Sequence, residues 1–279
     1  MDHPLLSIQN LTISFPHGSG RFEAVKDISF DLGKGSSMGI VGESGSGKSM
    51  TALSVMRLLP PAATIDSGSI WFRGRDRQPV DILGSTPGQV RQIRGKHISM
   101  IFQEPMTSLN PVYTCGDQVM EIMLNHMPYT RQQAREKAVE WFGEVELPDP
   151  ERILKSYPHE LSGGQRQRVM IAMAVSCEPQ LLIADEPTTA LDVTIQNSIL
   201  ELLRHLRERY RMSLIFISHD LAVVSEVADE IAVMYQGSVV EKGTRDQVIH
   251  QPFDHYTQGL IACRPPLDYK PMRLKTLDE

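Results

Sequence analysis

Residues 42–49 read Gly42-Glu43-Ser44-Gly45-Ser46-Gly47-Lys48-Ser49, and this octapeptide is the strongest indication of the fold in the sequence. It satisfies the pattern G-x-x-x-x-G-K-[ST], which is typical of a loop that binds phosphate groups. The apolar run 38–41 before it has the length of a short strand, and residues 48–59 after it have helical spacing that ends at Pro60. Glycines let backbone N–H groups point at the phosphates, and the helix N-terminus adds the positive end of its dipole. We expect Lys48 to reach the β- and γ-phosphates and Ser49 to coordinate Mg²⁺. The loop alone indicates only a protein that binds a nucleoside triphosphate, because kinases, GTPases and helicases contain the same pattern.

Runs with strand spacing alternate with runs of helical spacing on both sides of this loop. Residues 181–185 and 213–218 are apolar and of strand length, and the helical segment between them carries one apolar stripe from Ile195 to Leu206. Such alternation predicts an α/β fold around a largely parallel, two-sided sheet. The middle of the chain, about 105–165, is rich in Met and helical, and we interpret it as an inserted helical subdomain. The residues after Gln251 are rich in Pro and charge, and they are predicted to form an appendage.

Composition excludes several classes of protein. The 279 residues are 41% hydrophobic and 22% charged, which suits one large domain with a subdomain, and the formal net charge is −6. No Lys/Arg run resembles a nucleic-acid arm, and no window holds the ~18 consecutive apolar residues of a membrane span. The first ten residues lack the pattern of a secretory signal. Cys115, Cys177 and Cys263 are far apart, so we expect reduced cysteines rather than a zinc site.

An acidic pair follows the apolar strand 181–184. Asp185 and Glu186 would face the crevice beside the phosphate loop if the strand is parallel, because carboxyl ends of parallel strands meet at one edge. Asp185 is then expected to hold Mg²⁺, and Glu186 to orient or deprotonate the attacking water. Taken alone, two acidic residues at the end of a strand more often belong to a solvent-exposed loop. The phosphate loop upstream favours the functional interpretation, and with it hydrolysis over simple binding.

A second glycine-containing segment, Leu161-Ser162-Gly163-Gly164-Gln165, precedes a helical run with apolar residues on one face. Ser162 is well placed as an N-cap, and the two glycines leave the helix start without side chains, as an anion site needs. A capped helix after a flexible loop is the alternative. Because the phosphate loop already holds its own nucleotide, we expect this segment to close over a nucleotide bound to a second protomer.

These segments, in this order, resemble the ATP-binding cassette (ABC) ATPase family. The resemblance implies an ABC-type nucleotide-binding domain with an antiparallel β subdomain, a parallel-sheet core and an inserted helical subdomain. It implies that Gln103 links the metal site to the helical subdomain, that Asp192 meets the opposite protomer and that His219 contacts the γ-phosphate. Phe15 lies where the family has an aromatic residue that stacks on adenine, although a strand Phe is also ordinary core. The implied catalytic residues are Lys48, Gln103, Glu186 and His219, and the implied metal ligands are Ser49, Gln103 and Asp185.

The sequences of the motifs, such as IFQEPMTSLNP and ADEPTTALDVTIQ, resemble those of the D-type ATPase subunit of the oligopeptide and dipeptide importers. The resemblance implies ATP and Mg²⁺ as cofactors, an F-type ATPase partner or a second copy, two permeases and an external solute-binding protein. It implies a place on the cytoplasmic face of the membrane and a permease helix docked near residues 103–125. Related systems carry nickel, glutathione or other solutes, and an exporter is a more distant alternative. We expect an ATPase domain over 1–244, a short C-terminal extension over 245–279, and no iron–sulfur cluster, because only Cys263 lies in that tail.

Overall fold

The computed structural model describes residues 3–18, 20–74, 78–103, 108–189 and 191–262. A six-stranded sheet forms the centre, in the order β10-β9-β3-β8-β7-β6. Its five parallel strands are β3 (Ser37–Val41), β6 (Ile98–Ile101), β7 (Leu181–Asp185), β8 (Ser213–Ser218) and β9 (Glu230–Tyr235). Strand β10 (Ser238–Thr244) pairs antiparallel with β9 at one edge. Strands β3, β7 and β8 are buried along their whole length, as expected for a parallel sheet covered on both faces.

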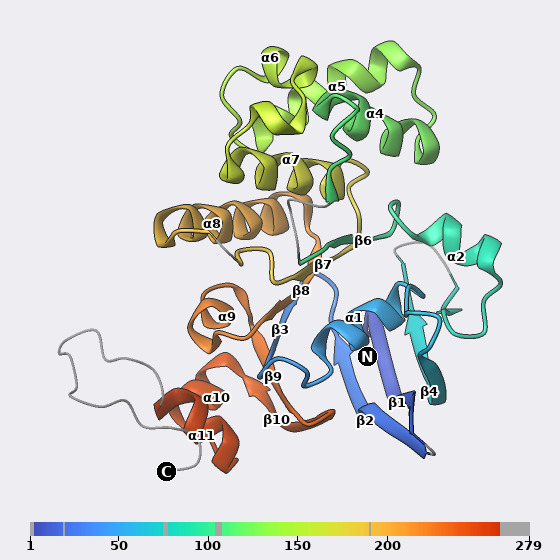
Figure 1. Ribbon diagram of the computed structural model, residues 1–279, viewed down its shortest axis with the longest axis vertical. Helices are drawn as coiled ribbons and strands as arrows, with labels where there is room; N and C mark the ends of the chain where they lie inside the picture. Colours follow the sequence, from blue (N-terminus) through green and yellow to red (C-terminus); the bar gives the residue numbers. More distant parts are fainter. Residues whose placement is uncertain (1–2, 19, 75–77, 104–107, 190, 263–279) are drawn as a thin grey trace.

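A second sheet is antiparallel and has four strands in the order β2-β1-β4-β5. These are β1 (Leu6–His17), β2 (Gly20–Leu32), β4 (Thr64–Phe72) and β5 (Val80–Asp81). Its buried face packs against one face of the parallel sheet together with α1 (Lys48–Val55). Helix α2 (Pro87–Ile93) follows and lies beside β6 at the margin of the molecule (Figure 1).

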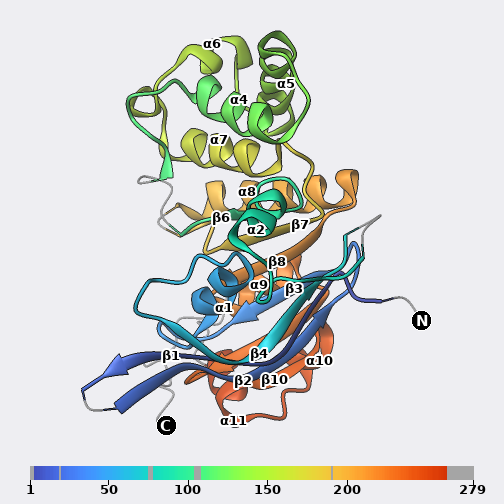
Figure 2. The ribbon, with the colours of Figure 1, turned by 90° about the vertical axis from the view of Figure 1, so that its right-hand side faces the viewer.

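The remaining helices gather on the other side of the parallel sheet. Helices α4 (Cys115–His126), α5 (Arg131–Glu144), α6 (Pro150–Lys155) and α7 (Gly163–Val175), with the 3₁₀ helix Pro158–Glu160, form a cluster at one end of the molecule in both views (Figures 1 and 2). Helices α8 (Val193–Tyr210) and α9 (Leu221–Val227) lie between this cluster and the C-terminal helices α10 (Arg245–His250) and α11 (His255–Ala262). This arrangement confirms the predicted α/β class with an antiparallel sheet, a parallel-sheet core and a helical insertion.

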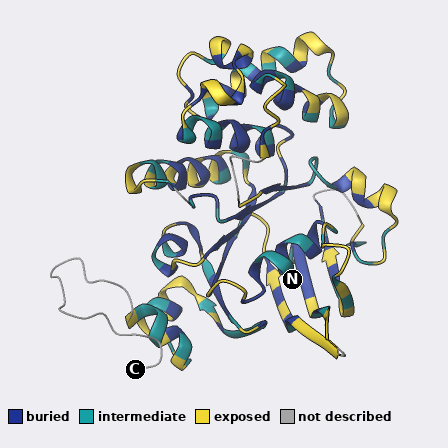
Figure 3. Ribbon diagram, in the orientation of Figure 1, coloured by how far each residue is buried: buried dark blue, intermediate teal, exposed yellow. Residues whose placement is uncertain are grey.

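Two hydrophobic cores lie on the two faces of the parallel sheet. Along β7, Leu181 and Ile183 belong to the core under the antiparallel sheet, whereas Leu182 and Ala184 belong to the core under the helices. The alternation follows from the two-residue period of a strand. Figure 3 shows the result as buried central strands surrounded by helices with exposed outer faces. Within the described residues, no helix combines the length and the apolar character that crossing a membrane requires.

Candidate functional site

The phosphate loop, residues 42–49, connects the buried strand β3 to helix α1. Gly47 is the residue before the helix, and it has a positive φ of 100°. A Cβ at Gly47 would lie 2.5 Å from the carbonyl oxygen of Ala24, and one at Gly42 would lie 2.0 Å from that of Met234. Only glycine fits such close backbone approaches. The tight path of the loop therefore explains the glycine at both positions.

Lys48 lies under this loop rather than in solvent. Lys48 is 4% exposed, and its Nζ donates hydrogen bonds to the carbonyl oxygens of Gly42 and Glu43, both at 2.7 Å. Burial lowers the pKa of Lys48, while the nearby carboxylates of Glu186, Asp185 and Glu43 act in the opposite direction. The loop thus holds a cation directly beside the backbone that would surround a phosphate.

Ser49 and Asp185 form the metal-binding candidate. The Ser49 hydroxyl donates to Oδ1 of Asp185 at 3.1 Å, and Asp185 is 4% exposed at the end of β7. Burial raises the pKa of Asp185, and the Ser49 hydrogen bond and Lys48 partly offset this effect. Two adjacent oxygen donors suit Mg²⁺, which takes one or two carboxylates and completes its shell with phosphates and water. The described residues contain no cluster of three or more His, Cys, Asp or Glu side chains that could hold a metal ion.

Glu186 stands at the centre of a small polar cluster. Its Oε2 accepts hydrogen bonds from Gln103 Nε2 at 3.1 Å and Thr189 Oγ1 at 2.8 Å, and His219 Nδ1 lies 3.5 Å from the same atom. Gln103 and His219 follow β6 and β8, the strands that flank β7, so the sheet brings the three predicted side chains together. Glu186 itself has a φ of 46°, and its N–H donates to the carbonyl of Ile217 at 2.9 Å.

The signature segment, Leu161–Gln165, begins helix α7 as predicted. The Ser162 side chain accepts from the N–H of Gln165, whose side chain accepts in turn from the Ser162 N–H, so the pair forms a capping box. A Cβ at Gly163 would meet nothing within 4 Å, so this helix end is open. Leu161 is buried, and Gly164 packs near Ile195 of α8. Among the described residues, no hydrogen bond joins this segment to the phosphate loop, and α7 and α1 lie in different parts of the molecule (Figures 1 and 2).

Asp192 and Phe15 complete the predicted set. Asp192 caps α8, because its Oδ1 accepts from the N–H of Ile195 at 2.9 Å. Ala190, two residues before it, is outside the described residues. Phe15 is half-buried on β1 and pairs across the hairpin with Phe22, which is 54% exposed. Phe22 was not among the predicted residues; the alternation in residues 20–32 indicates a strand but not its register against Phe15.

Two further contacts of the site were not foreseen. Thr189, which bonds Glu186, lies in the TTALD motif and could have been found there. Tyr256 of α11 could not, because it is 213 positions from the residue it contacts: its Oη accepts the N–H of Glu43 at 3.0 Å. Burial raises the pKa of Tyr256 to about 12, so the hydroxyl is neutral.

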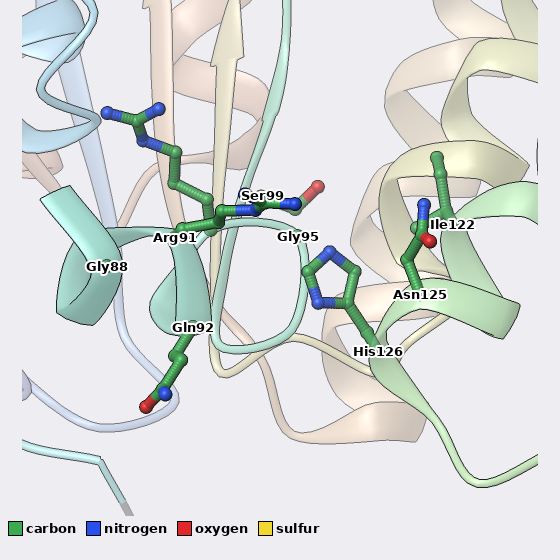
Figure 4. Close-up of a pocket in the computed structure, with 9 residues that line it drawn as sticks. Gly88, Arg91, Gln92, Gly95, Ser99, Ile122, Asn125 and His126 are labelled. Atoms are coloured by element: carbon green, nitrogen blue, oxygen red, sulfur yellow. The ribbon is translucent and has the colours of Figure 1, made fainter.

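A separate pocket of about 590 Å³ lies between α2 and α4 (Figure 4). Arg91 and Gln92 line it from α2, and Asn125 and His126 from α4, with the His126 ring directed toward the loop at Gly95. Burial lowers the pKa of His126, with Lys96 and Arg91 adding to the effect. None of the predicted site residues lines this pocket, so it is distinct from the phosphate-binding region.

Comparisons with known proteins give consistent results. The family model described as "ABC transporter" matches residues 25–189. The chain is 49% identical over 95% of its length to the probable D,D-dipeptide transport ATP-binding protein DdpD of Escherichia coli, covering 80% of that protein. It is 49% identical over 98% of its length to the dipeptide transport ATP-binding protein DppD of Bacillus subtilis, covering 81%. The match to the glutathione import ATP-binding protein GsiA of Salmonella paratyphi A is 48% over 94% of this chain, but spans 42% of that longer protein.

The fold is also similar to that of a solved structure. A dimeric ATP-binding cassette in a post-hydrolysis state, bound to ADP and Pi, matches with a TM-score of 0.76 and 26% sequence identity. The match covers 86% of this chain and 98% of the cassette.

Proposed function

This chain belongs to the ABC transporter family, and from that premise we propose that it is the ATP-hydrolysing subunit of an importer for dipeptides, oligopeptides or a related small solute. One observation carries the catalytic part of the proposal: the Glu186 carboxylate is contacted from the ends of both neighbouring strands, next to the loop that holds Lys48. Dipeptide-transport relatives favour a peptide cargo, and the glutathione-import relative supports a small peptide-like solute as the alternative.

In this mechanism the phosphate loop binds the triphosphate. The N–H groups of the loop and the start of α1 surround the β- and γ-phosphates. Lys48 keeps its bond to the Gly42 carbonyl and exchanges its bond to Glu43 for phosphate oxygens. Ser49, Asp185 and Gln103 would hold Mg²⁺, which when bound neutralises charge on the phosphates. Phe15, with Phe22 beside it, is positioned on the antiparallel sheet to stack on adenine.

Glu186 acts as the base in the hydrolytic step. A water in line with the γ-phosphate gives its proton to the carboxylate, while the bonds from Gln103 and Thr189 fix the orientation of the acceptor oxygen. As the water oxygen bonds to the γ-phosphorus, the bond from that phosphorus to the β–γ bridging oxygen breaks and ADP leaves. His219, beside Oε2, contacts the γ-phosphate and stabilises its negative charge. The Glu186 carboxylate thus activates the water, and the loop with Lys48 binds the phosphates.

A second ATPase subunit completes each site. We propose that the open helix start at Gly163 binds the γ-phosphate of a nucleotide held by that partner. The partner is an F-type subunit or, alternatively, a second copy of this chain. The dimeric cassette structure supports pairing, and the exposed Asp192 is available to meet the partner. The segment near residues 103–125 docks a permease helix, since Val112 and Tyr113 within it, and Phe102 just before it, are exposed apolar or aromatic side chains.

The proposal includes the boundaries and location of the chain. An ATPase domain spans 1–244, with helices inserted over about 105–165, and 245–279 form a short extension. The protein lies peripherally on the cytoplasmic face of the membrane, below two permeases and an external solute-binding protein. We propose no iron–sulfur cluster; Cys263, on which that statement depends, lies outside the described residues.

The test is Mg²⁺-dependent ATP turnover of the Glu186→Gln variant, with dimerisation followed by light scattering. Loss of the base is expected to lower turnover by at least about a hundredfold and to leave an ATP-bound dimer. Glu201→Gln, an exposed change on α8, is the matched control and should behave as wild type. Unchanged turnover in Glu186→Gln would overturn the base assignment. An inactive, monomeric wild type would require co-expression with its partner ATPase.

A further inference from the structure

The C-terminal helix α11 is fixed to the body of the protein by a buried carboxylate. Glu241 on β10 is 3% exposed, and its two oxygens accept the N–H groups of Phe253 at 3.1 Å and Asp254 at 3.2 Å. Asp254 Oδ1 in turn accepts the N–H of Tyr256 at 2.9 Å and so caps the start of α11. Each bond uses a charged acceptor, so the first turn of α11 has a defined position on the sheet edge.

From this position Tyr256 reaches the phosphate loop. Its hydroxyl oxygen accepts the Glu43 N–H at 3.0 Å, and its ring packs on Tyr235 of β9 with the centroids 4.3 Å apart. The same edge of the loop is held at a second point, because the N–H of Gly237 donates to the carbonyl of Ser46 at 3.2 Å. The turn between β9 and β10 and helix α11 therefore support the outer part of the loop together.

The contact with Tyr256 acts on one peptide group. The Glu43 N–H and the Gly42 carbonyl belong to the same planar peptide unit, in which they point in opposite directions. Tyr256 holds the N–H end, and Lys48 Nζ holds the carbonyl end at 2.7 Å. Because the unit rotates as a plane, the hydroxyl that fixes the N–H also fixes the carbonyl that positions the Lys48 ammonium group.

We propose that Tyr256 is a positioning residue for the nucleotide site: through the Gly42–Glu43 peptide it orients the phosphate loop and Lys48, and so links α11 to ATP affinity. The inference rests on the proposed function, since it concerns the same loop. Tyr256 touches no reacting atom in this arrangement. It sets the geometry in which phosphate binds, so its effect belongs to nucleotide affinity rather than to the hydrolytic step.

The experiment compares Tyr256→Phe with Tyr235→Phe in the full chain. Tyr256→Phe keeps the ring pair and removes only the acceptor, whereas Tyr235→Phe removes a hydroxyl that accepts from the Gln236 side chain. Tyr256→Phe is expected to raise the Kd and KM for MgATP about two- to tenfold, the effect of one lost hydrogen bond, with kcat changed less than about twofold. Tyr235→Phe should match wild type in all three. Thermal unfolding of each variant checks that the fold is retained.

Exchange of the Glu43 amide hydrogen, followed by NMR on glutamate-labelled protein, provides a readout that needs no nucleotide. Faster exchange in Tyr256→Phe but not in Tyr235→Phe supports the part of the inference that concerns loop orientation, even if wild type binds no MgATP and the proposed function fails. Faster exchange with an unchanged Kd for MgATP overturns the link to ATP affinity. Exchange and affinity equal to wild type in Tyr256→Phe overturn it. Equal losses in both variants overturn it too, because they would assign the effect to the ring pair and not to the hydroxyl.

Discussion

At the scale of single residues, the site places two oppositely charged side chains in nearly complete burial. Burial lowers the pKa of Lys48 and raises that of Asp185, so each group is pushed toward its neutral form. The Ser49 hydrogen bond and the mutual attraction of the two charges oppose this trend. The residues are therefore arranged for a highly charged ligand, at a cost to the protein without it.

This cost gives a prediction for Asp185→Asn. The pKa of Asp185 is raised in the folded state, so above that pKa the buried charge lowers the free energy of unfolding, and the penalty disappears as the pH falls through the raised pKa toward the ordinary one. We expect Asp185→Asn to stabilise the nucleotide-free protein by about 0.5–2 kcal/mol at neutral pH, with a gain that shrinks in acid. Thermal unfolding between neutral and acidic pH measures it. MgATP should stabilise wild type only; a gain that is independent of pH would contradict the argument.

The candidate residues could be found in the sequence where a motif coincides with a strand end. Gln103, Glu186 and His219 converge because they follow three adjacent parallel strands, which their apolar runs had indicated. Tyr256 could not be found, because its partner is an ordinary backbone N–H that no side-chain pattern marks. Phe22 lies between these cases: the regular register from His17–Gly20 to Ser14–Glu23 pairs it with Phe15, so the pair depends on the position of the hairpin turn, which alternation alone does not fix.

At the scale of elements, helix ends decide what each helix offers to a ligand. Helices α4, α5, α7 and α10 begin with a Thr or Ser cap, but only α7 follows its cap with two glycines. Its first N–H groups therefore remain accessible past Gly163, where a side chain would otherwise stand. This helix start could be predicted from the sequence, and so could the apolar stripe of α8, of which Ile199, Leu202, Leu203 and Leu206 are buried. The helix α11, which packs on the core, was not predicted, because Pro and charged residues obscure the pattern after Gln251.

Gly163→Ala tests the role of that helix start. An added methyl group meets no atom of this chain within 4 Å, so stability should not fall; a helical Gly→Ala change, here and in the control Gly143→Ala of α5, is expected to raise it by up to about 1 kcal/mol. In the assembled transporter, however, the methyl would stand between the helix start and the partner's nucleotide. We expect ATP turnover to fall about a hundredfold, the order seen when a donor to a transition-state anion is lost. MgATP binding to the isolated chain should remain; full turnover in the assembly would contradict a role in trans.

At the scale of the whole molecule, one core connects the helical cluster to the sheet. The core that contains Phe142 of α5 and Val169 of α7 continues through Leu203 of α8 to Val233 of β9. The helices α4–α7 are thus separate in outline but not in packing. A movement of the cluster that accompanies closure must shift it against the sheet-covering helices rather than detach it.

Phe142→Ala probes this continuity. The side chain is fully buried, and its loss is expected to cost about 3–5 kcal/mol. Because the core is continuous, calorimetry should show one transition moved to lower temperature as a whole. Val112→Ala, at a residue that is 71% exposed, should change the free energy of unfolding by less than about 0.5 kcal/mol. Two separate transitions, of which only one moves, would show that the helical cluster unfolds independently.

The hydroxyl of Tyr256 has a consequence for how genes of this kind are interpreted. A reading frame interrupted between the codons for His250 and Tyr256 would still encode every pattern by which the nucleotide site is recognised, from Gly42 to His219. Its product would nevertheless lack the group that holds the Gly42–Glu43 peptide. Such a gene would contain all the motifs and be counted as intact, although its product would bind ATP with lower affinity. The codon for Tyr256 therefore belongs among the positions that are checked for loss of function.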